Sequence, residues 1–369
     1  MKSVLLYYPF KMVANANSGS KLRPIEMHKA FLHWGKMNQI DIHLIMGNSE
    51  ERERHFDTLK KEGKLESLLF CYMENQTIPL WLTDPNHIPK KPFIDRKVLS
   101  YLKNHNIPTG VFYRDVYWKF DDLYPLKGIK KSMMQSIYRM EENFYEKYCE
   151  VIFLPSDSMG KYVNIKREKV ALPPGGKKKE INRGPISIPL KGLYVGGINN
   201  RAYGLPLLLK SLRKFNEKEE RLQLTVVCRE DELEKVSPDI LKDIEDLNVR
   251  ILHVSGSELD EVYKDSDIAF IPREKTTYND FSVPVKLVEY LSSGLPVVAT
   301  NCDAQQDFIE SGPYGVVGEP NVERFIEAIE KITENLAFYN EKIEESFLSN
   351  HSWDARVEKI QKTLLKEKL

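Results

Sequence analysis

The sequence predicts an α/β protein with two parallel-sheet domains of Rossmann-like type, and three observations support this. The chain has 369 residues, more than one hydrophobic core usually serves. In both halves, short apolar runs closed by turn residues alternate with segments of helical periodicity. This alternation favours parallel sheets, whose ligands bind at the carboxyl ends of the strands. Residues 173–185 are rich in proline, glycine and charge, so we place the linker there.

The composition narrows the choice of partners and compartment. Basic and acidic residues number 54 each, so no overall field attracts nucleic acid. The apolar run at residues 1–9 is too short for a signal peptide, and no later window has the roughly 18 uncharged apolar residues of a membrane span. We therefore expect a cytoplasmic protein whose separated cysteines are reduced core thiols. These are Cys71, Cys149, Cys228 and Cys302.

The first half of the chain predicts five strands, at residues 3–9, 40–46, 68–73, 110–118 and 151–156. Between the first strand and the first helix lies a polar loop that contains Gly19. A glycine there lets backbone approach a ligand, or simply makes a turn. Arg114 and Asp115 end the fourth strand. The two residues either contact a ligand or form a salt-bridged pair at the strand end, and the sequence allows both.

Residues 126–148 have helical periodicity, and we expect their apolar side to face the core. That side consists of Ile129, Met133, Ile137, Met140 and Phe144. The basic start of the segment offers a second interpretation, peripheral contact with anionic lipid heads on the inner face of the cell membrane. The cations are Lys127, Lys130 and Lys131.

The second half predicts strands at residues 192–198, 222–228, 249–255, 268–272 and 295–300. Between the last two lies a polar loop and a short helix, with Pro284 in its first turn and Gly294 at its end. The unpaired N–H groups of such a helix start suit a phosphate. Lys286 adds a cation, and Glu289, one turn on, offers a carboxylate for sugar hydroxyls. A helix start for phosphate, a cation and a carboxylate are together the groups that a nucleotide-sugar site needs.

Two runs in this stretch resemble the donor-binding segment of retaining GT-B glycosyltransferases of the bacterial group 1, or family 4, class. They are Pro-x-Lys-x-x-Glu-Tyr at residues 284–290 and Gly-x-Pro-Val-Val-Ala at residues 294–299. The resemblance implies two Rossmann-like domains facing an interdomain cleft, with a C-terminal helix crossing back to the first. The predicted boundaries are 1–180 for the acceptor-side domain, 185–350 for the nucleotide-sugar domain and 351–369 for the helix.

The resemblance also implies an activity and a set of site residues. It implies transfer of a hexose, with retention, from a nucleotide-diphosphate sugar to a glycan or lipid-linked acceptor, in cell-surface polysaccharide assembly and without metal or cofactor. Matched by position, Glu289 holds the nucleotide ribose, and Lys286 and Arg201 meet the diphosphate. The other donor-binding candidates are Gly19, Gly197, Arg229 and Pro284.

Three positions depart from the family pattern. Arg114 stands where the family often has the histidine of a His-Asp pair, and Asp115 follows it. No lysine lies between Arg201 and Gly204. The family's second carboxylate falls on a phenylalanine at position 281, and Asp280 is one residue out of register. The catalytic candidates are therefore Arg114, Asp115 and Asp280, and no nucleophile is assigned.

The residues also bear on several other possible functions. Asp265-Ser-Asp267 has the form of a metal motif, but it lies between a helix and a strand, where it caps a turn, so no metal site is predicted. A nucleotide-sugar epimerase could use the same two domains, but it would need acid/base residues in the cleft, and the histidines form no obvious set. The three departures from the family pattern would be explained if the chain were a non-catalytic partner subunit of a glycosyltransferase. A dinucleotide enzyme is disfavoured, because no Gly-x-Gly-x-x-Gly follows a strand.

Overall fold

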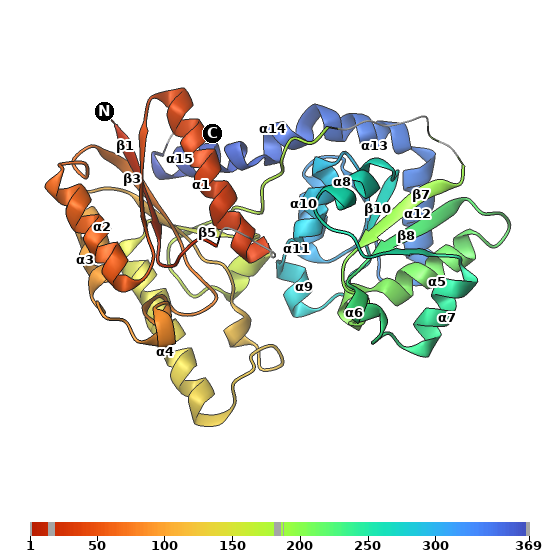
Figure 1. Ribbon diagram of the computed structural model, residues 1–369, viewed down its shortest axis with the longest axis horizontal. Helices are drawn as coiled ribbons and strands as arrows, with labels where there is room; N and C mark the ends of the chain where they lie inside the picture. The colour runs from red at the N-terminus through yellow and green to blue at the C-terminus, as the bar shows by residue number, and fades with distance from the viewer. Residues whose placement is uncertain (1, 14–18, 181–185, 187, 367–369) are drawn as a thin grey trace. The chain divides into compact units, whose positions relative to one another are not determined.

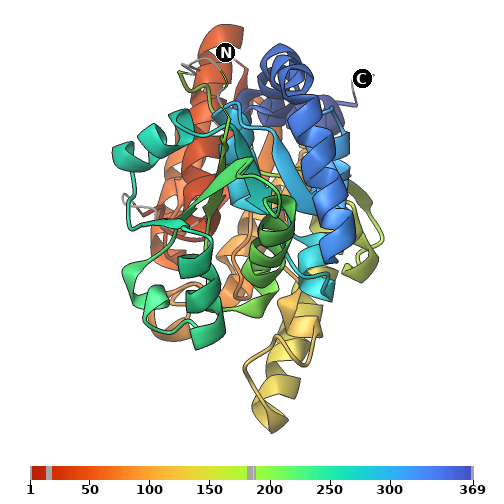
Figure 2. The same cartoon turned by 90° about the vertical axis from the view of Figure 1, so that its right-hand side faces the viewer.

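The structure is a computed structural model that describes residues 2–13, 19–180, 186 and 188–366. The chain divides into two compact units, unit 1 with Met1–Pro174 and Trp353–Leu369, and unit 2 with Gly175–Ser352. Each unit is a sheet with helices packed on it (Figures 1 and 2). The first passage of the chain from unit to unit, after Pro174, falls within the predicted linker.

Within the described residues, unit 1 contains a six-stranded parallel sheet in the order β2-β1-β3-β4-β5-β6. Its strands are β1 Ser3–Tyr8, β2 Asp41–Met46, β3 Leu68–Glu74, β4 Thr109–Phe112, β5 Val151–Leu154 and β6 Glu168–Ala171. Its α-helices are α1 Gly19–Asn38, α2 Ser49–Lys61, α3 Ile94–Asn104, α4 Gly128–Tyr148 and α15 Trp353–Leu364. The order is that of a flavodoxin-like doubly wound sheet extended by one strand.

The core of unit 1 explains why the first strand and the last helix belong together. All six residues of β1 are buried, as expected for a strand covered on both faces. Val357 and Ile360 of α15 are fully buried in the same apolar cluster as Val4 and Leu6 of β1. The C-terminal helix therefore packs in the unit that contains the N-terminus.

The described part of unit 2 contains a second six-stranded parallel sheet, in the order β12-β11-β10-β7-β8-β9. Its strands are β7 Leu190–Val195, β8 Leu222–Val227, β9 Arg250–Leu252, β10 Ile268–Ile271, β11 Val297–Thr300 and β12 Gly315–Gly318. Its α-helices are α5 Leu205–Phe215, α6 Glu230–Leu233, α7 Pro238–Asp246, α8 Ser257–Lys264, α9 Thr277–Phe281, α10 Val285–Ser292, α11 Asp303–Glu310, α12 Val322–Glu334, α13 Leu336–Lys342 and α14 Leu348–His351. Counted from β7, this is the Rossmann order 3-2-1-4-5-6 read from the other edge.

The helices of unit 2 cover both faces of its sheet. Residues of α5, α7 and α12 share one buried apolar cluster with the strands, and residues of α8, α10 and α11 share another. The predicted fold class, two parallel-sheet domains of Rossmann-like type, is confirmed. The four cysteines are buried free thiols, as expected. No helix in the described part of the chain combines the length and the apolar character needed to cross a membrane.

The expected orientation of α4 is wrong. Three residues of the side predicted to face the core are exposed: Ile129 at 88%, Met133 at 58% and Met140 at 59%. The helix packs instead through a side of mixed aromatic and acidic residues, namely Tyr138, Glu141, Glu142, Tyr145 and Tyr148. Oε1 of Glu141 accepts hydrogen bonds from the backbone N–H of Leu80 and from the hydroxyl of Tyr145, and the Glu142 carboxylate pairs with Lys119.

Candidate functional site

The candidate site lies where the strand order of unit 2 reverses, between β7 and β10. The loops that follow these strands meet, because the backbone N–H of Glu274 donates to the carbonyl of Ala202 at 3.1 Å. Gly204 is required at this contact. Its φ is +79°, and a Cβ there would lie 1.6 Å from the carbonyl oxygen of Pro272. Open α/β sheets bind their ligands at the carboxyl ends of the strands at such a point.

The helix α10 begins at this edge of the sheet. Pro284 is its N-cap, one position before the first turn in which the sequence places it. Gly294, at φ +74°, follows the end of the helix as predicted. The backbone N–H of Val195, the last residue of β7, donates to the hydroxyl of the buried Tyr290 at 2.7 Å. The start of α10 is thereby fixed beside the end of β7.

Lys286 and Glu289 lie next to each other on α10. Lys286 Nζ is 2.6 Å from Glu289 Oε2, and the hydroxyl of Tyr263, on α8, donates to the same oxygen at 2.9 Å. Both side chains are about one third exposed. No donor in the described part of the chain bonds to Oε1 of Glu289, so this oxygen is open to a ligand's hydroxyl. Sequence reasoning missed Tyr263, because nothing in its spacing links it to α10.

Arg273, directly after β10, is a second residue that the sequence analysis missed. Its guanidinium donates to the carbonyl of Ser282 at 3.0 Å and to its hydroxyl at 2.6 Å, and it also contacts the side-chain oxygen of Asn279. Burial lowers the pKa of Arg273. Its partners are neutral oxygens of α9 and of Ser282, which caps the C-terminal end of α9. Arg273 therefore braces the segment that leads into α10.

Asp280 lies on α9, in a stretch that the sequence treats as a polar loop and that is a short helix. Its Oδ1 accepts a long hydrogen bond, 3.4 Å, from the backbone N–H of Asp303 at the start of α11. Lys275 Nζ lies 3.9 Å from the same oxygen. Burial raises the pKa of Asp280, against the effect of Lys275. This carboxylate belongs to the edge at which α10 begins, and a hexose contact stays a prediction.

Arg201 lies in a helical turn, Arg201–Tyr203, between β7 and Gly204. Its side chain is 88% exposed, and Nε donates to Glu274 at 2.6 Å. This pair joins the loops after β7 and β10. An exposed ion pair contributes little to stability, so a diphosphate can replace Glu274 as the partner of Arg201 at small cost.

Gly197 lies in the same loop after β7, and Arg229 follows the neighbouring strand β8. A Cβ at Gly197 would lie 2.4 Å from the ring of Tyr203, so a larger residue there would displace this half-exposed ring. The backbone N–H of Ile198 donates to the carboxylate of Glu232, on α6, at 2.7 Å. Arg229 is the exposed N-cap of α6. A carboxylate, Glu232, therefore already occupies one of the loop amides that suit a phosphate.

The candidates in unit 1 include a residue of a buried charge network. Arg114 Nη2 is 3.0 Å from Glu74 Oε2, and Arg23 Nε is 3.3 Å from Glu74 Oε1. Tyr72 donates to Oε1 at 3.0 Å. Glu74 ends β3 and is fully buried. Burial lowers the pKa of Arg114, and the Glu74 carboxylate opposes that shift. These contacts favour the interpretation of Arg114 as an ion-paired residue at a strand end.

The two remaining candidates in unit 1 are Asp115, which follows β4, and Gly19, which begins α1. Asp115 accepts a hydrogen bond from the backbone N–H of Tyr117 at 2.9 Å, which shapes the turn after β4. Gly19 is the first residue of α1, and residues 14–18 of the predicted glycine loop lie outside the described residues. Their contact with a ligand stays a prediction.

Asp265 and Asp267 act as turn residues. Asp267 Oδ2 accepts a hydrogen bond from the backbone N–H of Lys191 at 2.8 Å, and the Lys191 ammonium pairs with Asp265. The pair fixes the turn before β10 to the start of β7. In the described part of the chain, no three or more His, Cys, Asp or Glu side chains gather as a metal site would require.

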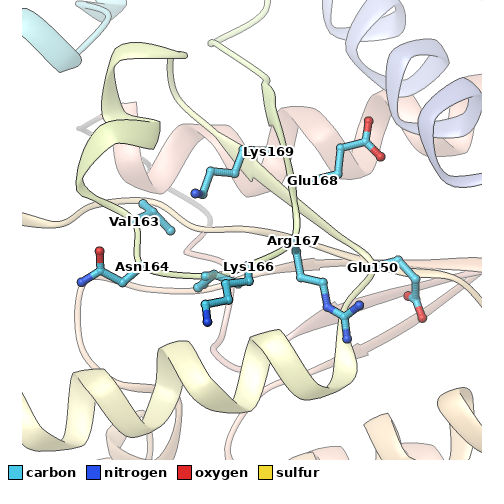
Figure 3. A pocket seen from close by; sticks show the side chains of 8 residues that line it. Glu150, Val163, Asn164, Lys166, Arg167, Glu168 and Lys169 are labelled. Atoms are coloured by element: carbon cyan, nitrogen blue, oxygen red, sulfur yellow. The ribbon is translucent and has the colours of Figure 1, made fainter.

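Two hollows lie at the opposite, amino ends of the strands. One, of about 580 Å³, is in unit 1 beside the starts of β5 and β6 (Figure 3). It is lined by Glu150, Val163, Asn164, Ile165, Lys166, Arg167, Glu168 and Lys169. The other, of about 770 Å³, is in unit 2 beside Lys191, Arg250 and Asp265. Ligands of open α/β sheets bind at the carboxyl ends, so neither hollow is the candidate donor site.

Comparison with known proteins adds a family and a set of related folds. The family model "Glycosyl transferases group 1" matches residues 190–335, which lie within unit 2. No curated protein sequence matches the chain. Among solved structures, the chain is similar to sucrose-phosphate synthase from Thermosynechococcus elongatus, with 15% identity, 98% of both chains covered and a TM-score of 0.58.

Two further solved structures cover nearly the whole chain. Anabaena HepE in complex with UDP has 12% identity, coverage of 99% of this chain and 100% of that chain, and a TM-score of 0.60. A glycosyltransferase from Rickettsia africae has 16% identity, coverage of 100% of both chains and a TM-score of 0.57. We conclude that the chain has the two-domain GT-B fold and that residues 190–335 of its second unit match the family model of group 1 glycosyl transferases.

Proposed function

We propose that this protein is a glycosyltransferase that moves a hexose from a nucleotide-diphosphate sugar to a glycan or lipid-linked acceptor, with retention and without a metal ion or cofactor. The observation that carries the proposal is the Lys286–Glu289 pair at the start of α10. It lies at the switch point of unit 2, inside the segment that matches group 1 glycosyl transferases. Two related structures, WaaB and WaaG, are described as lipopolysaccharide enzymes, which supports a role in cell-surface polysaccharide assembly.

The arrangement suits the charge that develops in the reaction. When the bond between the sugar and the diphosphate breaks, its electron pair leaves on the diphosphate oxygen. Lys286, Arg201 and the amides at the start of α10 would stabilise that charge more strongly than they stabilise the bound donor. Lys286 exchanges Glu289 for the diphosphate, and ribose hydroxyls donate to the Glu289 carboxylate. Arg273 and Tyr263 keep these groups in place.

Replacing Glu289 by glutamine tests the proposed donor site. The amide keeps one acceptor oxygen for Tyr263 but loses the charge, so donor affinity should fall about tenfold or more, with a parallel fall in turnover. The melting temperature should barely change, because Glu289 is partly exposed. We would measure nucleotide-sugar binding by calorimetry and turnover by release of nucleoside diphosphate. Glu327→Gln, which alters an exposed ion pair of α12, is the matched control.

Two outcomes count against the proposal, one from the Glu289→Gln variant and one from adding a chelator to wild type. If Glu289→Gln binds and turns over the donor as well as wild type, the carboxylate does not hold the ribose. If a chelator abolishes turnover and a divalent ion restores it, the proposed metal independence is wrong. The chelator arm bears on Asp265 and Asp267, which we propose to be turn residues because both contact Lys191.

A non-catalytic partner subunit of a glycosyltransferase is the second candidate, and one observation favours it. Two carboxylates, Glu232 and Glu274, already bind the Ile198 amide in the loop after β7 and Arg201, which is expected to meet the diphosphate. A chain that no longer binds a donor can keep such contacts without cost. Absence of binding by wild type to every nucleotide-sugar in a broad panel would select this candidate.

A further inference from the structure

The outer face of α4 is a row of apolar side chains that are largely exposed. We define this face as Ile129, Met133 and Met140, which are 88%, 58% and 59% exposed. At 100° per residue, the three side chains point within about 40° of one another. Figures 1 and 2 both show the first turns of α4 projecting from unit 1.

The opposite side of α4 is fixed, so the outer face cannot turn inward. The Tyr138 ring stacks on Trp118 with centroids 4.9 Å apart. Gln135 donates to the carbonyl of Trp118 at 3.0 Å, and Lys119 Nζ is 2.6 Å from the buried Glu142 carboxylate. Rotation of the helix would break these contacts and expose the aromatic rings. The apolar row is therefore a permanent feature of the surface.

The helix segment that carries this row has charges of one sign, and Asp121 and Asp122 lie in the turn before it. Residues 127–140 contain four basic residues and no acidic residue. They are Lys127, Lys130, Lys131 and Arg139. Lys131 pairs with Asp121, whereas in the described part of the chain no carboxylate lies within ion-pair distance of Lys127 or Lys130. Both of these lysines are exposed at the projecting end of the helix.

We propose that the outer face of α4 binds an anionic membrane surface. Ile129, Met133 and Met140 would enter the boundary between headgroups and acyl chains, and Lys127 and Lys130 would lie among the phosphates. The row is one side chain wide and contains no exposed Trp, Tyr or pocket, which protein–protein interfaces typically use as anchors. A lipid surface needs no complementary shape. The proposal does not depend on glycosyl transfer.

The test is co-sedimentation of the full chain with vesicles at physiological ionic strength. Wild type should bind vesicles that contain phosphatidylglycerol and should bind pure phosphatidylcholine vesicles weakly. The double variant Ile129→Ser/Met133→Ser should lose about tenfold or more of the partition coefficient. The variant Lys127→Gln/Lys130→Gln should lose about fivefold per lysine, and its binding should depend less on salt.

The matched control is Met37→Ser/Phe338→Ser, which removes exposed apolar side chains of α1 and α13 and should bind as wild type does. Circular dichroism should show that all variants are folded, since every replaced side chain is exposed. Equal vesicle binding by wild type and the α4 serine variant would overturn the proposal, as would failure of wild type to bind anionic vesicles. Loss of a protein complex in the serine variant, with vesicle binding unchanged, would instead identify a protein partner and also overturn it.

Discussion

Replacing Glu74 by alanine is expected to destabilise unit 1 by about 3–5 kcal/mol. Glu74 is fully buried, and its two carboxylate oxygens lie between the guanidinium groups of Arg23 and Arg114. Arg23 is 5% exposed. Without the Glu74 carboxylate, the positive charges of Arg23 and Arg114 remain in a poorly hydrated place and lose the carboxylate that lies between them. Truncation of one partner of a buried ion pair is costly for that reason.

The chain provides a selective probe for this measurement. All four tryptophans, Trp34, Trp81, Trp118 and Trp353, belong to unit 1, so their fluorescence during denaturant unfolding reports that unit. Asp57→Ala, also in unit 1, is the control, because it breaks an exposed ion pair with Lys97 worth about 0–1 kcal/mol. If Glu74→Ala lowers the free energy of unfolding no more than the control does, the charge network does not stabilise unit 1.

Replacing Gly204 by alanine is expected to disrupt the candidate donor site. The new Cβ would lie 1.6 Å from the carbonyl oxygen of Pro272, so the loops after β7 and β10 must move apart. The cost combines a residue at positive φ with an overpacked contact, about 2–5 kcal/mol in total. Nucleotide binding should be lost with it, since Arg201 and α10 would no longer be held together.

A closely matched control separates the contact from the backbone strain. Gly256, also in unit 2, has φ +59° and nothing within 4 Å of its missing Cβ. At φ +59° and ψ −132°, Gly256→Ala should cost only backbone strain, about 1–3 kcal/mol, and should leave nucleotide binding intact. Calorimetric melting measures both variants, and the tryptophan signal of unit 1 should be unchanged. Equal decreases of the melting temperature in the two variants would show that the contact with Pro272 adds nothing to the cost of the backbone strain.

The sequence could predict the fold because local signals and burial agree along most of the chain. The apolar runs at residues 268–272 and 295–300 are strands because they lie in a sheet covered on both faces. Pro284, Lys286 and Glu289 could be placed because helix starts have local signatures. Gly294 could be predicted as a helix end for the same reason.

The other features depend on contacts between distant parts of the chain. Tyr263 meets Glu289 across 26 residues, and Glu74 meets Arg114 across 40 residues. No spacing rule links such pairs. For α4, the sequence has apolar side chains on two sides of the helix, and periodicity alone cannot tell which side the fold buries. The choice of Tyr138 over Ile129 depends on Trp118, which lies in another element.

The most direct test of the donor site is hydrogen–deuterium exchange of wild type with and without nucleoside diphosphate-sugars. If the switch point of unit 2 binds the donor, amide protection should increase in residues 196–204 and 273–290. It should not increase in residues 223–225 and 248–250, which line the hollow of unit 2 in the first part of β8 and at the start of β9. Protection confined to those residues, or no change in unit 2 with any nucleotide-sugar that binds, would contradict the placement of the site between β7 and β10.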